Sequence, residues 1–197
     1  MLDLDGWDYL RMGSANVKGD VGEVIISSYL RSEVGTHLVR NIYLPYEDKT
    51  TEIDMLWLTS KGIFCIECKN YSGSIRTDFY EDYWKVEYSL WHTEKLFNPI
   101  KQNMRHTSAL AELLESYNID IEITPVVVFT DKVKLPNNAV NHGVFTISQF
   151  IDWYRSQNNV KTCTSEVLGA IYTIVSKYSD VSDVAKIAHT INLHRKG

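Results

Sequence analysis

The chain has 197 residues, of which 44% are hydrophobic and 23% charged, a composition that excludes the collagen-like, intrinsically disordered and disulfide-stapled classes. A chain of this length buries roughly 70% of its unfolded surface, which is enough for one domain with an ordinary core. The net charge of −5 excludes a global positive field for nucleic acid or anionic membranes, so any polyanion must be bound locally.

The first residues and the cysteines bear on the compartment. Residues 1–5 are acidic where a secretory signal is basic, and no apolar run reaches the roughly 20 residues of a membrane span. We therefore expect a cytoplasmic protein with reduced cysteines and no membrane partner. Cys65 and Cys68 form a C-x-x-C pair, but their strand-like context sends them to opposite faces, which argues against a zinc or redox site.

The first half of the chain predicts one helix followed by strands. Asp20 can cap exposed amide groups, and apolar residues then recur every three or four positions, so we expect a helix over residues 21–30. The aromatic-rich stretch at residues 75–91 predicts a hairpin with its turn near Glu81. Between these elements, three strand patterns lie at residues 37–44, 51–58 and 63–70.

The second half predicts a long helix, two strands and further helices. Asn98 and Pro99 open the helix, which ends near Ser116. The continuous apolar run at residues 124–130 predicts a strand buried on both faces, and residues 143–147 predict another. The remaining helices are expected at residues 150–155, 165–178 and 181–194.

The second and third strand patterns bring charged residues together. Folded onto each other across the loop at residues 59–62, they place Asp54 opposite Glu67 and Glu52 opposite Lys69, all on one face. Two unit charges about 5 Å apart repel by roughly 3 kcal/mol at an effective dielectric of 20. Lys69 or a divalent cation must therefore neutralise the two acids.

Two interpretations of this charged face stay open. A lysine beside two metal-binding carboxylates suits phosphodiester hydrolysis, because a metal lowers the pKa of bound water and an ammonium stabilises negative charge on phosphate. The other interpretation is a cross-strand salt-bridge ladder at a solvated strand end, since such pairs are common.

Several motifs carry a resemblance to a known family. They are Gly19-x-x-Gly22-Glu23, Asn41-x-Tyr43-Leu44-Pro45, Thr51-Glu52-Ile53-Asp54, Gly62-Ile63-Phe64-x-Ile66-Glu67-x-Lys69-Asn70-Tyr71-Ser72-Gly73, Trp84 and Asn98-Pro99-x-x-Gln102-Asn103-x-x-His106. Together, over about residues 17–130, they resemble the NERD (nuclease-related) domain, which is assigned to the PD-(D/E)xK nuclease superfamily. Ile53 stands where the superfamily signature has proline.

The resemblance implies a fold and a domain organisation. It implies an α/β fold with a restriction-endonuclease-like αβββαβ core and a mixed central sheet, and the order of elements above agrees. We expect this nuclease domain over residues 1–147 and a helical extension packed on it over residues 148–197. The helices of the extension can also form an oligomer or partner surface.

The resemblance also implies roles for individual residues. Asp54 with Glu67-Cys68-Lys69 matches the D…ExK signature, which implies Mg²⁺ or Mn²⁺ binding by Asp54, Glu67 and the main-chain carbonyl of Cys68. Lys69 would be catalytic and would position the attacking water. Glu23, in phase with the buried stripe of its helix, would be a third acidic ligand; the alternative is a boundary salt bridge or a helix-dipole contact.

Further residues are candidates for nucleic-acid binding. Gln102 and His106 lie four apart on one helix face and can reach a phosphate or Lys69, with Asn103 beside them; the alternative is a pair that only caps or packs. The aromatics of residues 71–91, with Arg76 and Lys85, form either a stacking surface for splayed bases or ordinary packing on one face of a hairpin.

We therefore predict a Mg²⁺- or Mn²⁺-dependent phosphodiesterase that cleaves DNA, and the residues do not exclude RNA. The alternative is a non-catalytic module that keeps the nuclease scaffold to bind nucleic acid or a protein. A third alternative is an assembly protein that works through its C-terminal helices.

Overall fold

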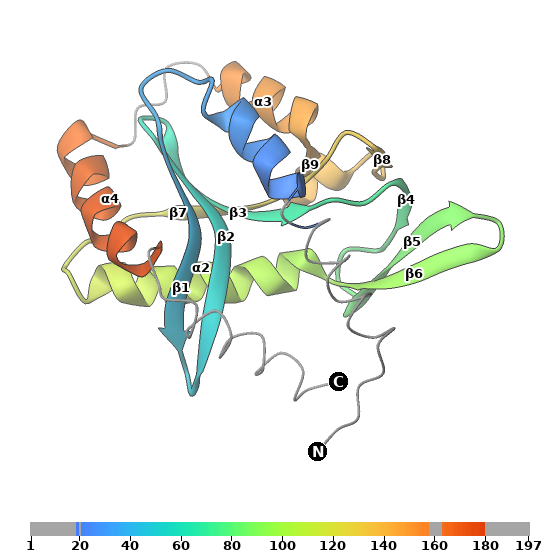
Figure 1. The fold of residues 1–197 in the computed structure, drawn as a ribbon, viewed down its shortest axis with the longest axis horizontal. Coiled ribbons are helices and arrows are strands. Elements are labelled where there is room, and N and C mark those ends of the chain that lie inside the picture. The colour runs from blue at the N-terminus through green and yellow to red at the C-terminus, as the bar shows by residue number, and fades with distance from the viewer. Residues whose placement is uncertain (1–18, 20, 158–162, 180–197) are drawn as a thin grey trace.

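A computed structural model describes residues 19, 21–157 and 163–179 (Figure 1). A helix over residues 21–30 comes first. The later elements are β1 (His37–Tyr46), β2 (Lys49–Thr59), β3 (Gly62–Lys69), β4 (Gly73–Arg76), β5 (Tyr83–Ser89), β6 (His92–Phe97), α2 (Pro99–Glu115), β7 (Ile123–Phe129), β8 (Val133–Lys134), η1 (Ala139–His142), β9 (Val144–Thr146), α3 (Ile147–Ser156) and α4 (Ser165–Ser179).

The strands form two sheets. The main sheet has the order β1-β2-β3-β7-β9, with antiparallel pairs from β1 to β3 and parallel pairs from β3 to β9. The predicted mixed central sheet is thereby confirmed, and β7 lies in its interior as its apolar run predicts. The second sheet has the order β6-β5-β4-β8.

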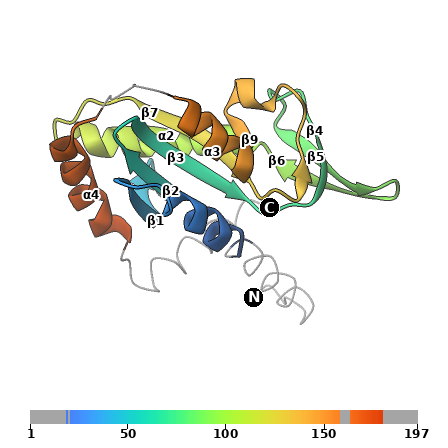
Figure 2. The same cartoon turned by 90° about the horizontal axis from the view of Figure 1, so that it is seen from above.

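Helices cover both faces of the main sheet. On one face, α2 and α4 bury a core cluster that includes Leu56, Cys65 and Leu110. On the other face, the helix over residues 21–30 and α3 bury a second cluster that includes Trp57 and Phe64. Figures 1 and 2 show the sheet between these two helical layers, so the α/β architecture with an αβββαβ order is confirmed.

Local sequence signals explain the helix that carries part of the site. Pro99 occupies the first turn of α2, and the side chain of Asn98 accepts hydrogen bonds from the N–H groups of Ile100 and Lys101 at 2.9 and 3.3 Å. The start and end of this helix agree with the sequence pattern. The expected helix at residues 181–194 lies outside the described residues.

The aromatic stretch forms more than the expected hairpin. β4 and β5 pair antiparallel across a turn that contains Glu81, as predicted, but β6 adds a third strand that the sequence pattern did not indicate. The short β8 and η1 were not predicted either. No helix in the described part of the chain has both the length and the apolar character to span a membrane.

The predicted strand register is correct near the loop and wrong farther from it. β2 and β3 pair as expected from Leu58↔Ile63 to Met55↔Ile66, where the ladder ends. Glu52 does not pair with Lys69; it lies opposite Tyr43 on β1, whose hydroxyl donates to its Oε1 at 2.7 Å. The reason is that β2 stays with β1 while β3 continues along β7, so the two strands separate before their ends.

Candidate active site

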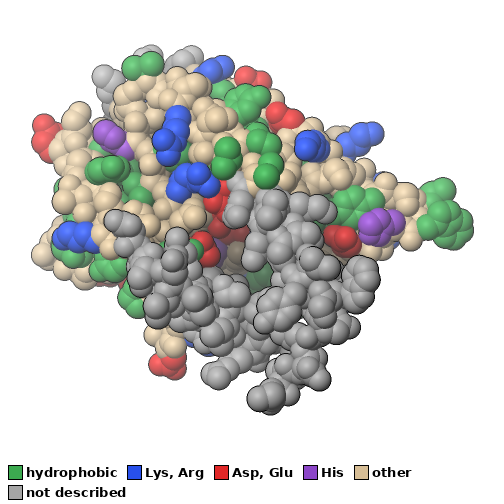
Figure 3. Space-filling model, viewed as in Figure 1, with side chains coloured by type: hydrophobic (Ala, Val, Ile, Leu, Met, Phe, Trp, Pro, Cys, Tyr) green, Lys and Arg blue, Asp and Glu red, His purple; other side chains and the backbone are tan. Residues whose placement is uncertain are grey.

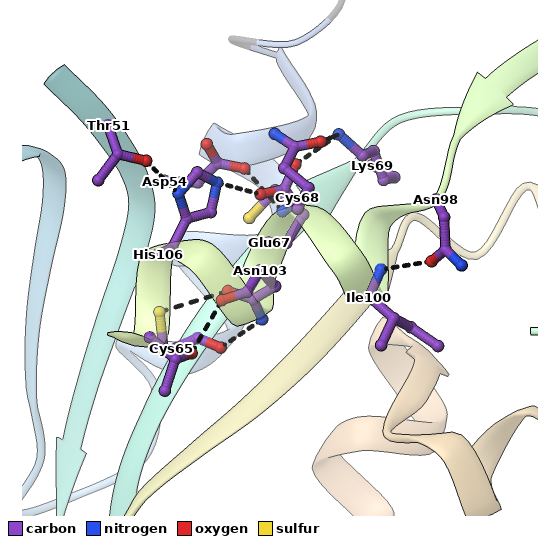
Figure 4. A network of polar contacts seen from close by, with 12 residues as sticks. Thr51, Asp54, Cys65, Glu67, Cys68, Lys69, Asn98, Ile100, Asn103 and His106 are labelled. Atoms are coloured by element: carbon purple, nitrogen blue, oxygen red, sulfur yellow. Dashed lines mark hydrogen bonds and ion pairs between the residues drawn. The ribbon is translucent and has the colours of Figure 1, made fainter. Parts of the chain in front are cut away.

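Three elements, β2, β3 and α2, carry most of the predicted site residues (Figure 4). Residues two apart on a strand share a face, so Asp54 lies on the face of Leu56, and Glu67 and Lys69 lie on the face of Cys65. Leu56 and Cys65 pack in the cluster that α2 covers. The two carboxylates and the ammonium therefore lie on the side of the sheet that faces α2.

Lys69 is held by acceptors from two elements. Its Nζ donates to Oε1 of Glu67 at 2.5 Å and to Oε1 of Gln102, on α2, at 3.2 Å. An ammonium has three N–H donors, so these contacts leave one for a group that enters from solvent. Burial lowers the pKa of Lys69, but the charges of Glu67 and Asp54 outweigh it and raise the pKa to about 12.

The charge of Asp54 is only partly compensated. Its Oδ2 accepts a hydrogen bond from the N–H of Cys68 at 2.8 Å. Burial, followed by repulsion from Glu67, raises the pKa of Asp54 well above its usual value, although Lys69 and the Cys68 N–H act in the opposite direction. A bound cation would relieve this repulsion.

His106 links the third strand to the second. Its Nδ1 lies 2.7 Å from the hydroxyl of Thr51 on β2, and its Nε2 lies 3.1 Å from Oε2 of Glu67 (Figure 4). Burial raises the pKa of Glu67, but Lys69 and His106 outweigh burial and lower it, so the carboxylate stays ionised. His106 is only 7% exposed, so it supports Glu67 from within the molecule.

Glu23 has a cationic partner of its own. Its Oε2 accepts from Nη2 of Arg40 on β1 at 2.9 Å. The helix that carries it packs on the opposite face of the sheet from α2, although its charge still contributes to the raised pKa of Asp54. The boundary salt bridge that the sequence analysis gave as the alternative is present, and a metal at Glu23 would share the carboxylate with Arg40.

Asn103 lies in the interior rather than on a binding surface. Its Nδ2 donates to the carbonyls of Cys65 and Val126 at 2.9 and 2.8 Å, and its Oδ1 accepts from Sγ of Cys65 at 3.3 Å. The residue is 1% exposed. It fastens α2 across β3 and β7, so in this structure its amide has no surface to offer a nucleic acid.

Arg76 and Lys85 lie on the second sheet, away from the two carboxylates. Both pair with Glu87, at 3.0 and 3.2 Å, which offsets part of their positive charge. The aromatics around them divide: Phe79 and Trp84 are buried, whereas a second set is exposed. That exposed set comprises Tyr80, Tyr83 and Trp91.

A cavity opens beside Lys69. It has a volume of about 700 Å³, and its wall combines the end of β3 with the loop after it, Lys132, and residues of β5 and β6. Sequence reasoning assigned no role to the lining residues Asn70 and Ser72, and it placed Tyr71 only among the aromatics of residues 71–91. The signal was available, because they follow Lys69 directly in the longest of the motifs.

The donor set determines which metal the site can hold. Among the described residues, no three His, Cys, Asp or Glu side chains gather as a metal-binding group. Asp54 and Glu67 remain as two carboxylates whose mutual repulsion Lys69 offsets only in part. This set fits Mg²⁺ or Mn²⁺, because Mg²⁺ binds through one or two carboxylates and keeps several waters. Acidic side chains reach the surface near the middle of the face in Figure 3.

Comparisons with known proteins assign the chain to a family. An uncharacterized protein of Bacillus anthracis is 27% identical over 194 residues, which cover 91% of this chain and 85% of that protein. No solved structure matches the chain significantly. The family model described as nuclease-related domain matches residues 18–130, which include the site residues of β2, β3 and α2. The chain therefore belongs to the nuclease-related (NERD) domain family, whose placement in the PD-(D/E)xK superfamily agrees with the fold.

Proposed function

We propose that the protein is a Mg²⁺- or Mn²⁺-dependent nuclease that hydrolyses phosphodiester bonds of DNA. One observation carries the proposal: Lys69 is held by Glu67 and Gln102 at the edge of a cavity, with the incompletely compensated Asp54 carboxylate beside it. The family assignment supports a nuclease-related role, and the geometry supplies the residues for it.

Asp54 and Glu67 would hold the metal, with the carbonyl of Cys68 and waters as further oxygen donors. When bound, the metal would polarise a phosphoryl oxygen and lower the pKa of a bound water. The N–H of Cys68 fixes one oxygen of Asp54, so that this carboxylate keeps its orientation without an ion. Glu23 would share its carboxylate between Arg40 and the metal.

Lys69 would orient the attacking water or stabilise charge on the phosphate. Its contacts to Glu67 and Gln102 fix the direction of its remaining N–H. A donor that already points at the reacting group needs little reorganisation energy when charge develops in the transition state. Gln102 thereby positions Lys69 rather than the phosphate itself. His106 would hold Glu67 from the opposite side, with Thr51 holding the imidazole ring.

The test is a cleavage assay on single-stranded, nicked and linear duplex DNA with Mg²⁺ or Mn²⁺. Asp54→Asn keeps the shape of the side chain and removes its charge, and Lys69→Ala removes the ammonium. We expect each variant to lose at least about a hundredfold in rate, the scale of a removed transition-state donor. EDTA should abolish cleavage by the unaltered protein.

Two matched controls lie far from the cavity. Asp120→Asn changes an exposed acid in the loop before β7, and Lys177→Ala removes an exposed lysine on α4. Both should cleave like the unaltered protein. Cleavage by Asp54→Asn or Lys69→Ala at the rate of the unaltered protein would contradict the assigned roles. DNA binding without cleavage under any divalent ion would favour the non-catalytic scaffold instead.

A further inference from the structure

The hairpin of β5 and β6 ends in two exposed apolar side chains. Leu90 is 92% exposed and Trp91 is 95% exposed, the latter more than any other tryptophan among the described exposed hydrophobics. In Figure 1 this hairpin extends away from the rest of the molecule, and in Figure 3 hydrophobic side chains gather at its outer end. A large aromatic ring at such a tip has no packing role within the described chain.

The side chains next to the tip of the same hairpin form one wall of the cavity beside Lys69. Tyr88, His92 and Glu94 line this wall. The rings of Tyr88 and His92 lie with centroids 4.8 Å apart at 32°, and the Tyr88 hydroxyl donates to Oε2 of Glu94 at 2.9 Å. The hairpin therefore presents two adjacent rings at the cavity wall, Tyr88 and His92, and a third aromatic ring, Trp91, exposed at its tip.

The two walls of the cavity differ in charge. The body of the molecule contributes Lys69 and Lys132, whereas the hairpin contributes Glu94 with its two rings. A phosphate is attracted to the first wall and repelled by Glu94 on the second. A base suits the second wall, because rings stack on its faces and a carboxylate accepts from its amino group. The volume of about 700 Å³ lies in the range of cavities that hold small organic ligands.

We propose that this cavity and the hairpin bind an unpaired nucleotide next to the scissile phosphate, with Trp91 stacking on a neighbouring base. The inference rests on the proposed function, and it narrows the substrate to nucleic acid that is single-stranded or locally unpaired. A base inside a duplex is stacked on both faces, so it cannot stack against the rings of Tyr88 and His92 while its phosphate lies at Lys69.

The test measures binding by the full chain in EDTA, so that no cleavage takes place. The probes are a fluorescein-labelled DNA strand of about 20 nucleotides, longer than the sites of about 4–16 nucleotides seen in single-strand-binding folds, and the same strand annealed to its complement. Fluorescence anisotropy gives the dissociation constant for each. We expect the unaltered protein to bind the single strand more tightly than the duplex.

Trp91→Ala should weaken single-strand binding about tenfold, within the range for loss of one stacked base, and leave duplex binding nearly unchanged. Trp91→Phe should restore most of the affinity because it keeps an aromatic face. Tyr29→Ala, which removes an exposed ring from the helix over residues 21–30, is the matched control and should bind like the unaltered protein. Melting temperatures confirm that all variants are folded.

Several results would overturn the inference. One is that Trp91→Ala binds the single strand as tightly as the unaltered protein, and another is that it loses the same affinity for the single strand and for the duplex. The inference also fails if the unaltered protein shows no measurable DNA binding, or if Trp91→Ala keeps its DNA affinity but loses self-association in size-exclusion chromatography. The last would identify the tip as a protein contact. Cleavage assays test the proposed function separately. If single-strand binding depends on Trp91 but the protein does not cleave DNA, only the proposed function is contradicted. If the protein cleaves DNA but binding does not depend on Trp91, only this inference is contradicted.

Discussion

At the scale of single residues, the buried Asp54 carboxylate of the candidate site lowers the stability of the folded protein. Asp54 lies close enough to Glu67 for repulsion to add to burial, and both raise its pKa in the folded protein. A group whose pKa is raised by folding stabilises the fold below its unfolded pKa, and this contribution is lost as pH rises through the folded pKa. Above its unfolded pKa, Asp54 therefore weakens the fold, because its charged form is less favourable in the folded protein than in the unfolded chain.

Asp54→Asn should accordingly raise the melting temperature at neutral pH in EDTA. Asn keeps an oxygen that can accept from the N–H of Cys68, and it removes the repulsion. A gain of about 1 kcal/mol corresponds to roughly 2–4 °C for a chain of this size, and calorimetry measures it. The difference in melting temperature should shrink below about pH 4, because the carboxyl group of Asp54 is then as uncharged as the amide that replaces it.

Melting temperatures measured with divalent ions complement those measured in EDTA. Mg²⁺ or Mn²⁺ should raise the melting temperature of the unaltered protein and have little effect on Asp54→Asn, because a ligand stabilises only the state that binds it. If Asp54→Asn melts lower than the unaltered protein in EDTA, Asp54 is a structural group and the interpretation of its raised pKa is wrong.

At the scale of elements, the sequence predicted which residues share a face and failed where strands exchange neighbours. The period of two along β2 and β3 was sufficient to place Asp54, Glu67 and Lys69 together. It could not show that β2 pairs with β3 only from Met55 to Thr59 and that its earlier residues pair with β1 alone.

Helix α2 gives a second case of the same kind. Its boundaries follow from Asn98 and Pro99, but the rotation of the helix on the sheet does not. That rotation buries Asn103 and His106 and leaves Gln102 at Lys69, although all three looked equivalent in sequence. The depth of a polar residue is set by packing between elements, which one helix pattern cannot specify.

The helix over residues 21–30 approaches β3 through a glycine, and this contact yields a prediction. A Cβ on Gly22 would lie 2.6 Å from Cβ of Asn70, which is too close for either backbone to stay in place. Gly22→Ala should therefore lower stability by about 1–3 kcal/mol, as overpacking does, and lower the melting temperature. Asn70 lines the cavity, so DNA binding should weaken as well.

Gly169 on α4 provides the matched substitution. A Cβ there meets nothing within 4 Å, so Gly169→Ala should raise stability by about 0.5–1 kcal/mol through helix propensity. Thermal denaturation followed by circular dichroism compares the two. Effects of the same sign on both variants would mean that the close approach of Gly22 to Asn70 is not tight in solution.

At the scale of the whole molecule, the charge distribution limits how nucleic acid can be held. The chain carries a net charge of −5, and Arg76 and Lys85, which the sequence offered as nucleic-acid-binding residues, pair with Glu87. Of the cavity's lining residues, Lys69 and Lys132 are the lysines. Binding should then depend on a few contacts at one cavity and on stacking, rather than on an extended basic track.

Salt dependence measures this directly. Each phosphate contact with a single strand contributes a slope of about −0.7 to the logarithm of affinity against the logarithm of salt, so two contacts predict a slope near −1.4. Raising salt from about 50 to 200 mM should then weaken single-strand binding by roughly sevenfold, and Lys132→Ala should reduce the slope by about half. A loss of a thousandfold would instead require about seven phosphate contacts and would contradict binding at one cavity.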